Sequence, residues 1–156
     1  MMMELNHRTY HGSIFLCGFM GTGKTTIGKK LAERLQTRFI DLDEEIEKQE
    51  GRSITEIFSA KGESYFRRQE WLTLKQLLPE NKGIYALGGG SLQNQHVVDH
   101  LKLFGLLIFL HTPFEILFDR IREDRSRPML LDKDGNKKQD DQLRQELILL
   151  FNKRKP

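Results

Sequence analysis

The hydrophobic positions of this chain form short runs of strand length that alternate with stretches of helical spacing. Four runs predict strands, at residues 13–17 (SIFLC), 38–43 (RFIDLD), 83–87 (GIYAL) and 106–111 (LLIFLH). Each run is apolar at consecutive positions, which is typical of strands that are covered on both faces. Alternating strands and helices of this kind predict an α/β fold, a three-layer sandwich with a parallel sheet flanked by helices.

Helical spacing fills the segments around these runs. Ile27, Leu31 and Leu35 recur every four residues and predict the apolar face of a helix. Ser53 and Glu56 have the spacing of a helix-capping pair, and a further helix is predicted from about residue 62 to 78, before a proline. A last helix is predicted from an apolar stripe of Leu143, Leu147, Leu150 and Phe151.

Composition and charge narrow the possible functions. The 156 residues suit one domain, which we assign to residues 1–156, and acidic and basic residues are interleaved to a net charge of +3. We therefore expect no nucleic-acid partner. The single cysteine, Cys17, allows no internal disulfide, and no apolar run approaches the roughly 18 residues of a membrane span. These features predict a cytoplasmic protein without a membrane partner, and we expect a monomer.

The clearest chemical signal follows the first predicted strand. Residues 18–25, GFMGTGKT, fit the pattern G-x-x-x-x-G-K-[ST] in full, between a strand and the start of a helix. Such glycines let backbone N–H groups point at phosphate oxygens, the lysine reaches the β and γ phosphates, and the Thr25 hydroxyl binds Mg²⁺. The alternative is a glycine-rich turn that binds nothing. The motif predicts nucleotide contacts from Gly21, Thr22, Gly23, Lys24, Thr25 and Thr26.

Two carboxylates end the second predicted strand. Because side chains alternate along a strand, Asp41 and Asp43 are expected to point the same way, at the carboxyl edge of the sheet. One acid could serve a metal ion and the other the hydroxyl of an acceptor. The alternative is that both merely cap the end of a strand.

Two further clusters suggest a binding site for an acidic acceptor. Arg67 and Arg68 follow an aromatic pair on a predicted helix, so only one of them can face inward and grip a carboxylate, and Glu70 could fix the guanidinium of Arg67. Residues 88–90 are three glycines after a strand, whose backbone could approach a ligand closely. A solvated helix face and a flexible turn are the plain alternatives.

Together these segments resemble the shikimate kinase family. The matching pieces are GFMGTGKTTIG, FIDLDEEIE, ITEIFSAKGESYFRRQE, YALGGGSL and RPML, which occur in family order over about residues 13 to 131. The resemblance implies a P-loop kinase fold and ATP-dependent phosphorylation of the 3-hydroxyl of shikimate, a step of aromatic amino acid biosynthesis. It also implies Mg²⁺ as cofactor, with ATP and shikimate as the small-molecule partners.

The resemblance also implies a role for individual residues. Asp43 corresponds to the acid that contacts the acceptor hydroxyls and acts as base, and Asp41 to its partner toward Mg²⁺, through water. Arg67 and Arg154 correspond to the two arginines that bind the substrate carboxylate. Further implied substrate contacts are Gly88, Gly89 and Gly90, with Phe58 and Phe66 as walls of the pocket.

A lid is implied at about residues 119–138. Within it, Arg127 corresponds to the arginine that reaches the transferring phosphate, and Arg120 to a residue that packs against adenine. Arg122 and Arg125 are better explained as solvated residues. The implied core spans 13–123, and the implied substrate-binding helical region spans 44–78.

The resemblance is incomplete at the C-terminal side. The family's closing strand, adenine loop and terminal helix have no counterpart before Pro156, so we expect a longer natural protein and an uncovered apolar sheet edge. Two rivals stay open at this point. One is another small-metabolite kinase of the same fold, such as a gluconate kinase. The other is a non-catalytic nucleotide-binding module, which would bind ATP without shikimate-stimulated ADP release.

Overall fold

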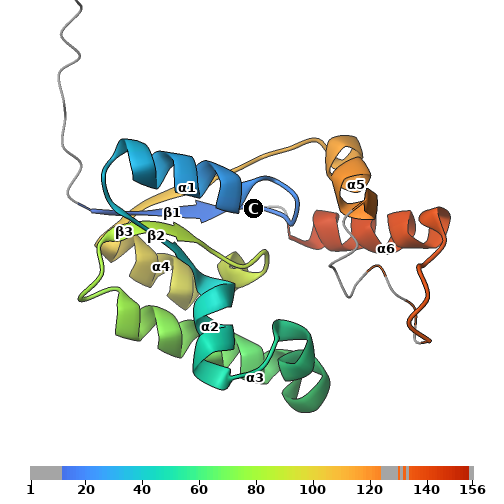
Figure 1. The fold of residues 1–156 in the computed structure, drawn as a ribbon, viewed down its shortest axis with the longest axis horizontal. Helices are drawn as coiled ribbons and strands as arrows, with labels where there is room; N and C mark the ends of the chain where they lie inside the picture. Colours follow the sequence, from blue (N-terminus) through green and yellow to red (C-terminus); the bar gives the residue numbers. More distant parts are fainter. Residues whose placement is uncertain (1–11, 124–129, 131, 133, 155–156) are drawn as a thin grey trace, which may run out of the picture.

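The computed structural model describes residues 12–123, 130, 132 and 134–154. Its centre is a sheet of four parallel strands in the order β2-β3-β1-β4 (Figure 1). The strands are β1 (Ser13–Cys17), β2 (Arg38–Asp41), β3 (Gly83–Ala86) and β4 (Gly105–Phe109). The parallel sheet predicted from the apolar runs is therefore confirmed.

Helices cover both faces of this sheet, which confirms the three layers. In Figure 1, α1 lies on one side of the sheet, α3 and α4 lie on the other, and α5 and α6 lie beyond one end of it. The helices are α1 (Lys24–Arg34), α2 (Leu42–Glu50), α3 (Ile54–Leu77), α4 (Gln95–Phe104), α5 (Phe114–Glu123) and α6 (Asp140–Lys153), with a short 3₁₀ turn, η1 (Ser91–Gln93), before α4.

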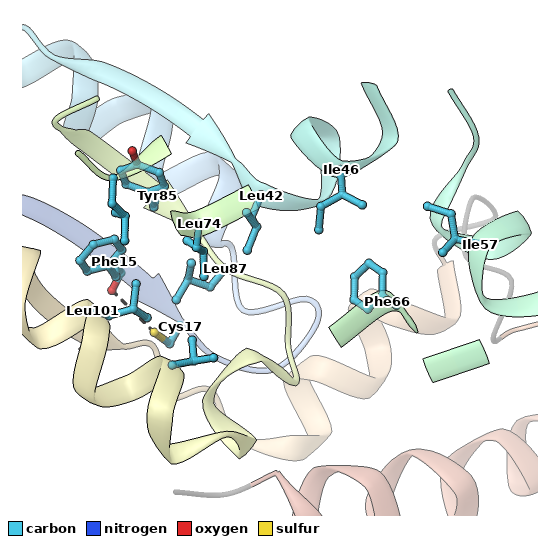
Figure 2. Close-up of a cluster of buried hydrophobic side chains, with 12 residues drawn as sticks. Phe15, Cys17, Leu42, Ile46, Ile57, Phe66, Leu74, Tyr85, Leu87 and Leu101 are labelled. Atoms are coloured by element: carbon cyan, nitrogen blue, oxygen red, sulfur yellow. Dashed lines mark hydrogen bonds between the residues drawn. The ribbon is translucent and has the colours of Figure 1, made fainter. Parts of the chain in front are cut away.

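The alternation of side chains along β1 divides the core between the two faces. Ile14 and Leu16 pack toward Ala32 of α1, whereas Phe15 and Cys17 belong to the larger cluster on the opposite face (Figure 2). This larger cluster joins the sheet to α2, α3 and α4. Its buried members are Phe15, Cys17, Leu42, Ile46, Ile57, Phe66, Leu74, Leu78, Tyr85, Leu87, Val97 and Leu101.

The predicted apolar face of α1 is confirmed only in part, because Leu31 packs against the core cluster that contains Ile14, Leu16 and Ala32. Ile27 and Leu35 are 42% and 50% exposed, and the residues of α1 that are buried are Gly28 and Ala32. The reason is steric, since a Cβ atom on Gly28 would overlap the ring of Phe39 on β2. A small residue allows the helix to approach the sheet closely, so the buried face follows residue size and not hydrophobicity.

The second predicted strand is shorter than expected. β2 ends at Asp41, which becomes the N-cap of α2, so Asp43 stands in the first turn of a helix and not on a strand. The capping pair of Ser53 and Glu56 is confirmed, since Ser53 accepts from the Glu56 N–H and Glu56 accepts in return from the Ser53 N–H. The predicted start of a second helix near residue 62 is the kink at Gly62, inside α3.

A second hydrophobic cluster supports the phosphate-binding loop. The predicted stripe of α6 is confirmed, because Leu143, Leu147 and Phe151 are buried against Phe19 of this loop and against α5. The predicted uncovered edge is also visible, since Leu106 and Phe109 of β4 are 49% and 38% exposed. Among the described residues, the helices are all too short or too polar to cross a bilayer.

Candidate active site

The loop between β1 and α1 has the backbone form of a phosphate cradle. Gly21 and Gly23 have φ angles of 81° and 92°, in the left-handed region that favours glycine. This conformation turns the chain into the N-terminus of α1, where N–H groups lack partners within the helix. Lys24 donates from Nζ to the carbonyl oxygens of Gly18 at 2.8 Å and Phe19 at 3.1 Å, so its ammonium group lies over the loop.

The acid at the end of β2 reaches this loop directly. The Thr25 hydroxyl donates to Oδ2 of Asp41 at 3.2 Å, and the other oxygen of Asp41 accepts from the N–H of Asp43 at 3.1 Å. A hydroxyl and a carboxylate are hard oxygen donors of the type that Mg²⁺ prefers, and Mg²⁺ keeps most of its water ligands. The pair therefore fits a magnesium ion, although the described residues hold no larger cluster of metal-binding side chains.

Asp43 lies in an environment that opposes its ionisation. Its Oδ1 is buried and has no hydrogen-bond partner among the described residues. Burial, together with the negative charges of Glu70 and Asp41, raises the pKa of Asp43 to about 6, and the cations of Lys24 and Arg67 partly offset that rise. A carboxylate with a raised pKa and an unsatisfied oxygen is suited to accept a proton from a hydroxyl group.

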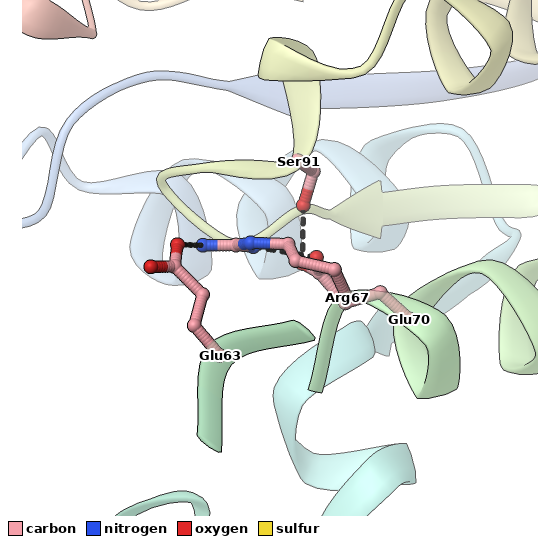
Figure 3. Close-up of polar contacts among 4 residues, drawn as sticks. All are labelled: Glu63, Arg67, Glu70 and Ser91. Atoms are coloured by element: carbon pink, nitrogen blue, oxygen red, sulfur yellow. Dashed lines mark hydrogen bonds and ion pairs between the residues drawn. The ribbon is translucent and has the colours of Figure 1, made fainter. Parts of the chain in front are cut away.

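The helix after the kink supplies the predicted arginine. Arg67 is partly buried while Arg68 is exposed, so the two are distinguished as expected. Figure 3 shows the contacts of Arg67: Nη1 donates to Oε2 of Glu70 at 2.5 Å, and Glu70 also accepts from the Ser91 hydroxyl at 2.6 Å. Glu70 is buried, and it therefore fixes the guanidinium of Arg67 in place, which confirms the pairing predicted from their spacing.

Charged side chains lie directly against the backbone of the triple glycine, which leaves little room for side chains at these positions. A Cβ atom at Gly90 would overlap the guanidinium of Arg67, and one at Gly88 would lie 2.8 Å from Oε1 of Glu70 and 3.3 Å from Oδ1 of Asp43. A Cβ atom at Gly89 would lie 3.3 Å from Nη1 of Arg154 and 3.8 Å from the Met20 nitrogen of the phosphate cradle. The glycine loop therefore contacts both arginines and the phosphate cradle.

Arg154 reaches the site from the end of α6. Its Nε is buried without a hydrogen-bond partner among the described residues. Burial and the nearby charge of Arg67 lower the pKa of Arg154, and the carboxylates of Glu63 and Glu70 act in the opposite direction. Two guanidinium groups thus lie close together beside a glycine loop. Such a pair attracts an anion.

Other candidate residues stand in different positions. Arg120 is exposed and donates from Nη1 to the Gly21 carbonyl at 3.0 Å, so α5 is tied to the cradle.

Phe66 is buried and Phe58 is half-exposed, with ring centroids 4.8 Å apart. Arg127 lies outside the described residues. Sequence reasoning missed Ser91, because only the fold brings this buried hydroxyl to Glu70.

The predicted residues thus converge on one region. Asp43 is close enough to Lys24, Asp41, Arg67 and Glu70 for the charge of each to influence its pKa, and the glycine loop bridges the cradle and the arginines. An acceptor that bears both a hydroxyl and a carboxylate would find a base and two cations beside a polyphosphate site. This arrangement suits the transfer of a phosphate to a small hydroxy acid.

Comparison with known proteins identifies the family. The family model of shikimate kinase matches residues 20–155. The chain belongs to the shikimate kinase family. It is 43% identical over 92% of its length to the shikimate kinase of Persephonella marina, of which it covers 81%. This membership excludes the gluconate kinase alternative.

Solved structures of shikimate kinases share the fold. The shikimate kinase of Bacteroides thetaiotaomicron matches with a TM-score of 0.83 and 34% identity, over 92% of this chain and 79% of that chain. The shikimate kinase of Acinetobacter baumannii, solved in complex with shikimate, matches with a TM-score of 0.76 and 34% identity, over 92% and 77% of the two chains. The P-loop kinase fold expected from the motifs is therefore confirmed.

Proposed function

We propose that this chain transfers the γ-phosphate of ATP to the 3-hydroxyl of shikimate, giving shikimate 3-phosphate and ADP. Membership of the shikimate kinase family supports this activity. The observation that carries the proposal for the residues is the convergence of Asp43, Arg67 and Arg154 on a glycine loop that also touches the phosphate cradle.

The transfer follows from these positions. The cradle and Lys24 hold the triphosphate, while Arg67, Arg154 and residues 88–90 hold the shikimate carboxylate and ring. The 3-hydroxyl oxygen then forms a bond to the γ-phosphorus as the bond from that phosphorus to the β,γ-bridging oxygen breaks. The hydroxyl proton passes to the Asp43 carboxylate. Positioning and charge stabilisation provide most of the acceleration in such a reaction.

A magnesium ion is the proposed cofactor. Thr25 and Asp41 would hold it, the hydroxyl directly and the carboxylate through water, and when bound it neutralises charge on the phosphate oxygens. The hydrogen bond between these two side chains supports this assignment, because it places both oxygens beside the cradle.

Three further assignments complete the proposal. Arg120 packs against adenine, and its bond to the Gly21 carbonyl ties α5 to the cradle. Arg127, which lies outside the described residues, is assigned to the transferring phosphate, and a lid is assigned to residues 119–138. We also propose that the protein is a monomer that acts in the cytoplasm, in keeping with its single buried thiol at Cys17.

A pair of neighbouring arginines tests the carboxylate grip. We expect Arg67→Ala to raise the KM for shikimate by about 10- to 100-fold, the cost of losing charged hydrogen bonds, and to change the KM for ATP far less. Arg68→Ala is the matched control, since Arg68 is exposed on the same helix, and it should leave both constants near those of the wild type. Equal effects of Arg67→Ala on both substrates would remove the assigned role.

A further inference from the structure

Arg67 contacts two carboxylates of very different character (Figure 3). Nη1 bonds to Glu70, whose side chain is 4% exposed, while Nη2 lies 3.5 Å from Oε1 of Glu63, whose side chain is 60% exposed. Glu70 is also held by the Ser91 hydroxyl. Glu70 is therefore a permanent partner of Arg67, whereas Glu63 can leave for water at little cost.

Glu63 also influences the second arginine. The negative charge of Glu63 raises the pKa of Arg154, against the lowering caused by burial and by Arg67. Arg67 and Arg154 carry two positive charges, and Glu70 balances one of them. The exposed carboxylate of Glu63 supplies a second negative charge beside these two arginines, which we assign to the binding of the shikimate carboxylate.

The backbone explains why Glu63 stands here. Gly62 has φ 78° and ψ 174°, which breaks α3 into two helical segments, and Glu63 begins the second of them. Arg67 follows four residues later, one turn along the same face. Glu63 lies in the first turn after this break, and its side chain is exposed. It can therefore rotate away from Arg67 without disturbing the core.

We propose that Glu63 is an internal competitor of the substrate carboxylate. Its carboxylate occupies the Nη2 edge of Arg67 in the free enzyme and is displaced when shikimate binds; this inference rests on the proposed function. An exposed ion pair at this spacing is weak, so its displacement weakens shikimate binding by only about twofold. Glu63 therefore adjusts affinity for the acid without taking part in phosphate transfer.

The first test variant removes the negative charge of Glu63 and keeps the shape of its side chain. Glu63→Gln is expected to lower the KM and the Kd for shikimate about twofold, with kcat and the KM for ATP unchanged. Glu63→Asp keeps the charge but shortens the side chain, so its KM for shikimate should lie between those of the wild type and Glu63→Gln. Glu80→Gln, an exposed charge beyond the far end of α3, is the control for net charge and should match the wild type.

A neutral ligand separates competition from a general change of the pocket. The carboxamide of shikimate cannot pair with Arg67 as an anion, so its Kd should be the same for the wild type and Glu63→Gln. An equal gain for the carboxamide would overturn the proposal.

Kinetics and calorimetry distinguish a failure of the competitor role of Glu63 from a failure of the proposed function. If the wild type phosphorylates shikimate but Glu63→Gln has an unchanged or higher KM, or a reduced kcat, the competitor role fails and the proposed function survives. If the wild type neither binds nor phosphorylates shikimate, both fail together.

Discussion

At the scale of single residues, Asp43 is placed where chemistry and stability oppose each other. Its carboxyl group is buried beside Glu70 and Asp41, and its pKa is raised to about 6 from 3.8. Ionised Asp43 is the form that can accept a proton from the acceptor hydroxyl. The same ionised form is the one that the surrounding protein disfavours.

The substitution Asp43→Asn separates these two effects. We expect kcat to fall by at least about 10²-fold, the usual contribution of a general base, while the affinity for ATP is retained. Retained turnover would remove the assigned role of Asp43. Steady-state kinetics with a direct nucleotide-binding measurement would give both constants.

The same variant should be more stable than the wild type near neutral pH. The folded pKa of Asp43 lies above its unfolded value, so its ionisation costs stability, which is lost progressively as pH rises from about 4 through about 6. At pH 7 we expect Asp43→Asn to gain about 1–3 kcal/mol. Urea denaturation at pH 7 and below pH 4 would measure this gain, which should disappear at the lower pH.

The pH dependence of activity provides a separate check. Because the free enzyme must hold Asp43 ionised, kcat/KM for shikimate should be level above about pH 6 and fall about tenfold per unit below it. A profile that stays level down to pH 4.5 would show that the base is another group, or that its pKa is not raised.

The chemistry of these residues was more predictable from sequence than their surroundings. The types and spacing of Asp41, Asp43 and Arg67 indicated a site, and their resemblance to a family supplied the roles. Strand alternation gave the wrong local structure for Asp43, because the strand ends two residues earlier than predicted, at Asp41, which caps a helix. Ser91 could not be predicted, since its partner Glu70 is 21 residues away and only the fold brings them together.

At the scale of elements, the contact of α1 with the sheet depends on the absence of a side chain. A Cβ atom on Gly28 would overlap the ring of Phe39 and lie 3.2 Å from Leu16. Periodicity could not reveal this, because it weighs hydrophobicity and not volume. The prediction of an apolar face at Ile27 and Leu35 failed for that reason.

The variant Gly28→Ala tests this packing. Alanine is favoured over glycine in a helix by about 1 kcal/mol, yet we expect a net loss of about 1–3 kcal/mol, because overpacking must shift Phe39 or the helix. Ile27→Ala is the control, since Ile27 is exposed, and it should change stability by less than about 0.5 kcal/mol. Thermal denaturation of both variants would decide, and a stabilised Gly28→Ala would contradict the packing described.

Other elements followed directly from local rules. The capping box at Ser53 and the apolar stripe of α6 involve residues within one or two turns of each other, so the sequence contains the whole interaction. The strand positions were also predicted, with ends that differ by one or two residues. Element ends depend on caps and neighbours, which explains these small differences.

At the scale of the whole molecule, the site lies at the carboxyl ends of the parallel strands. Asp41 ends β2, the glycine loop follows β3 and the cradle follows β1, so three loops meet where the strands end. α3 and α6 then add one arginine each, Arg67 and Arg154. Residues from five parts of the chain thereby form a single site. Their order in sequence could suggest this assembly only through resemblance to a family.

The most direct test of the whole account is ADP release in a coupled assay, with ATP and Mg²⁺, in the presence of shikimate, gluconate or no acceptor. We predict release that depends on shikimate and matches the amount of shikimate 3-phosphate formed, with little release for gluconate or water. ADP release at the same rate with and without shikimate, or release favoured by gluconate, would contradict the assignment of the site.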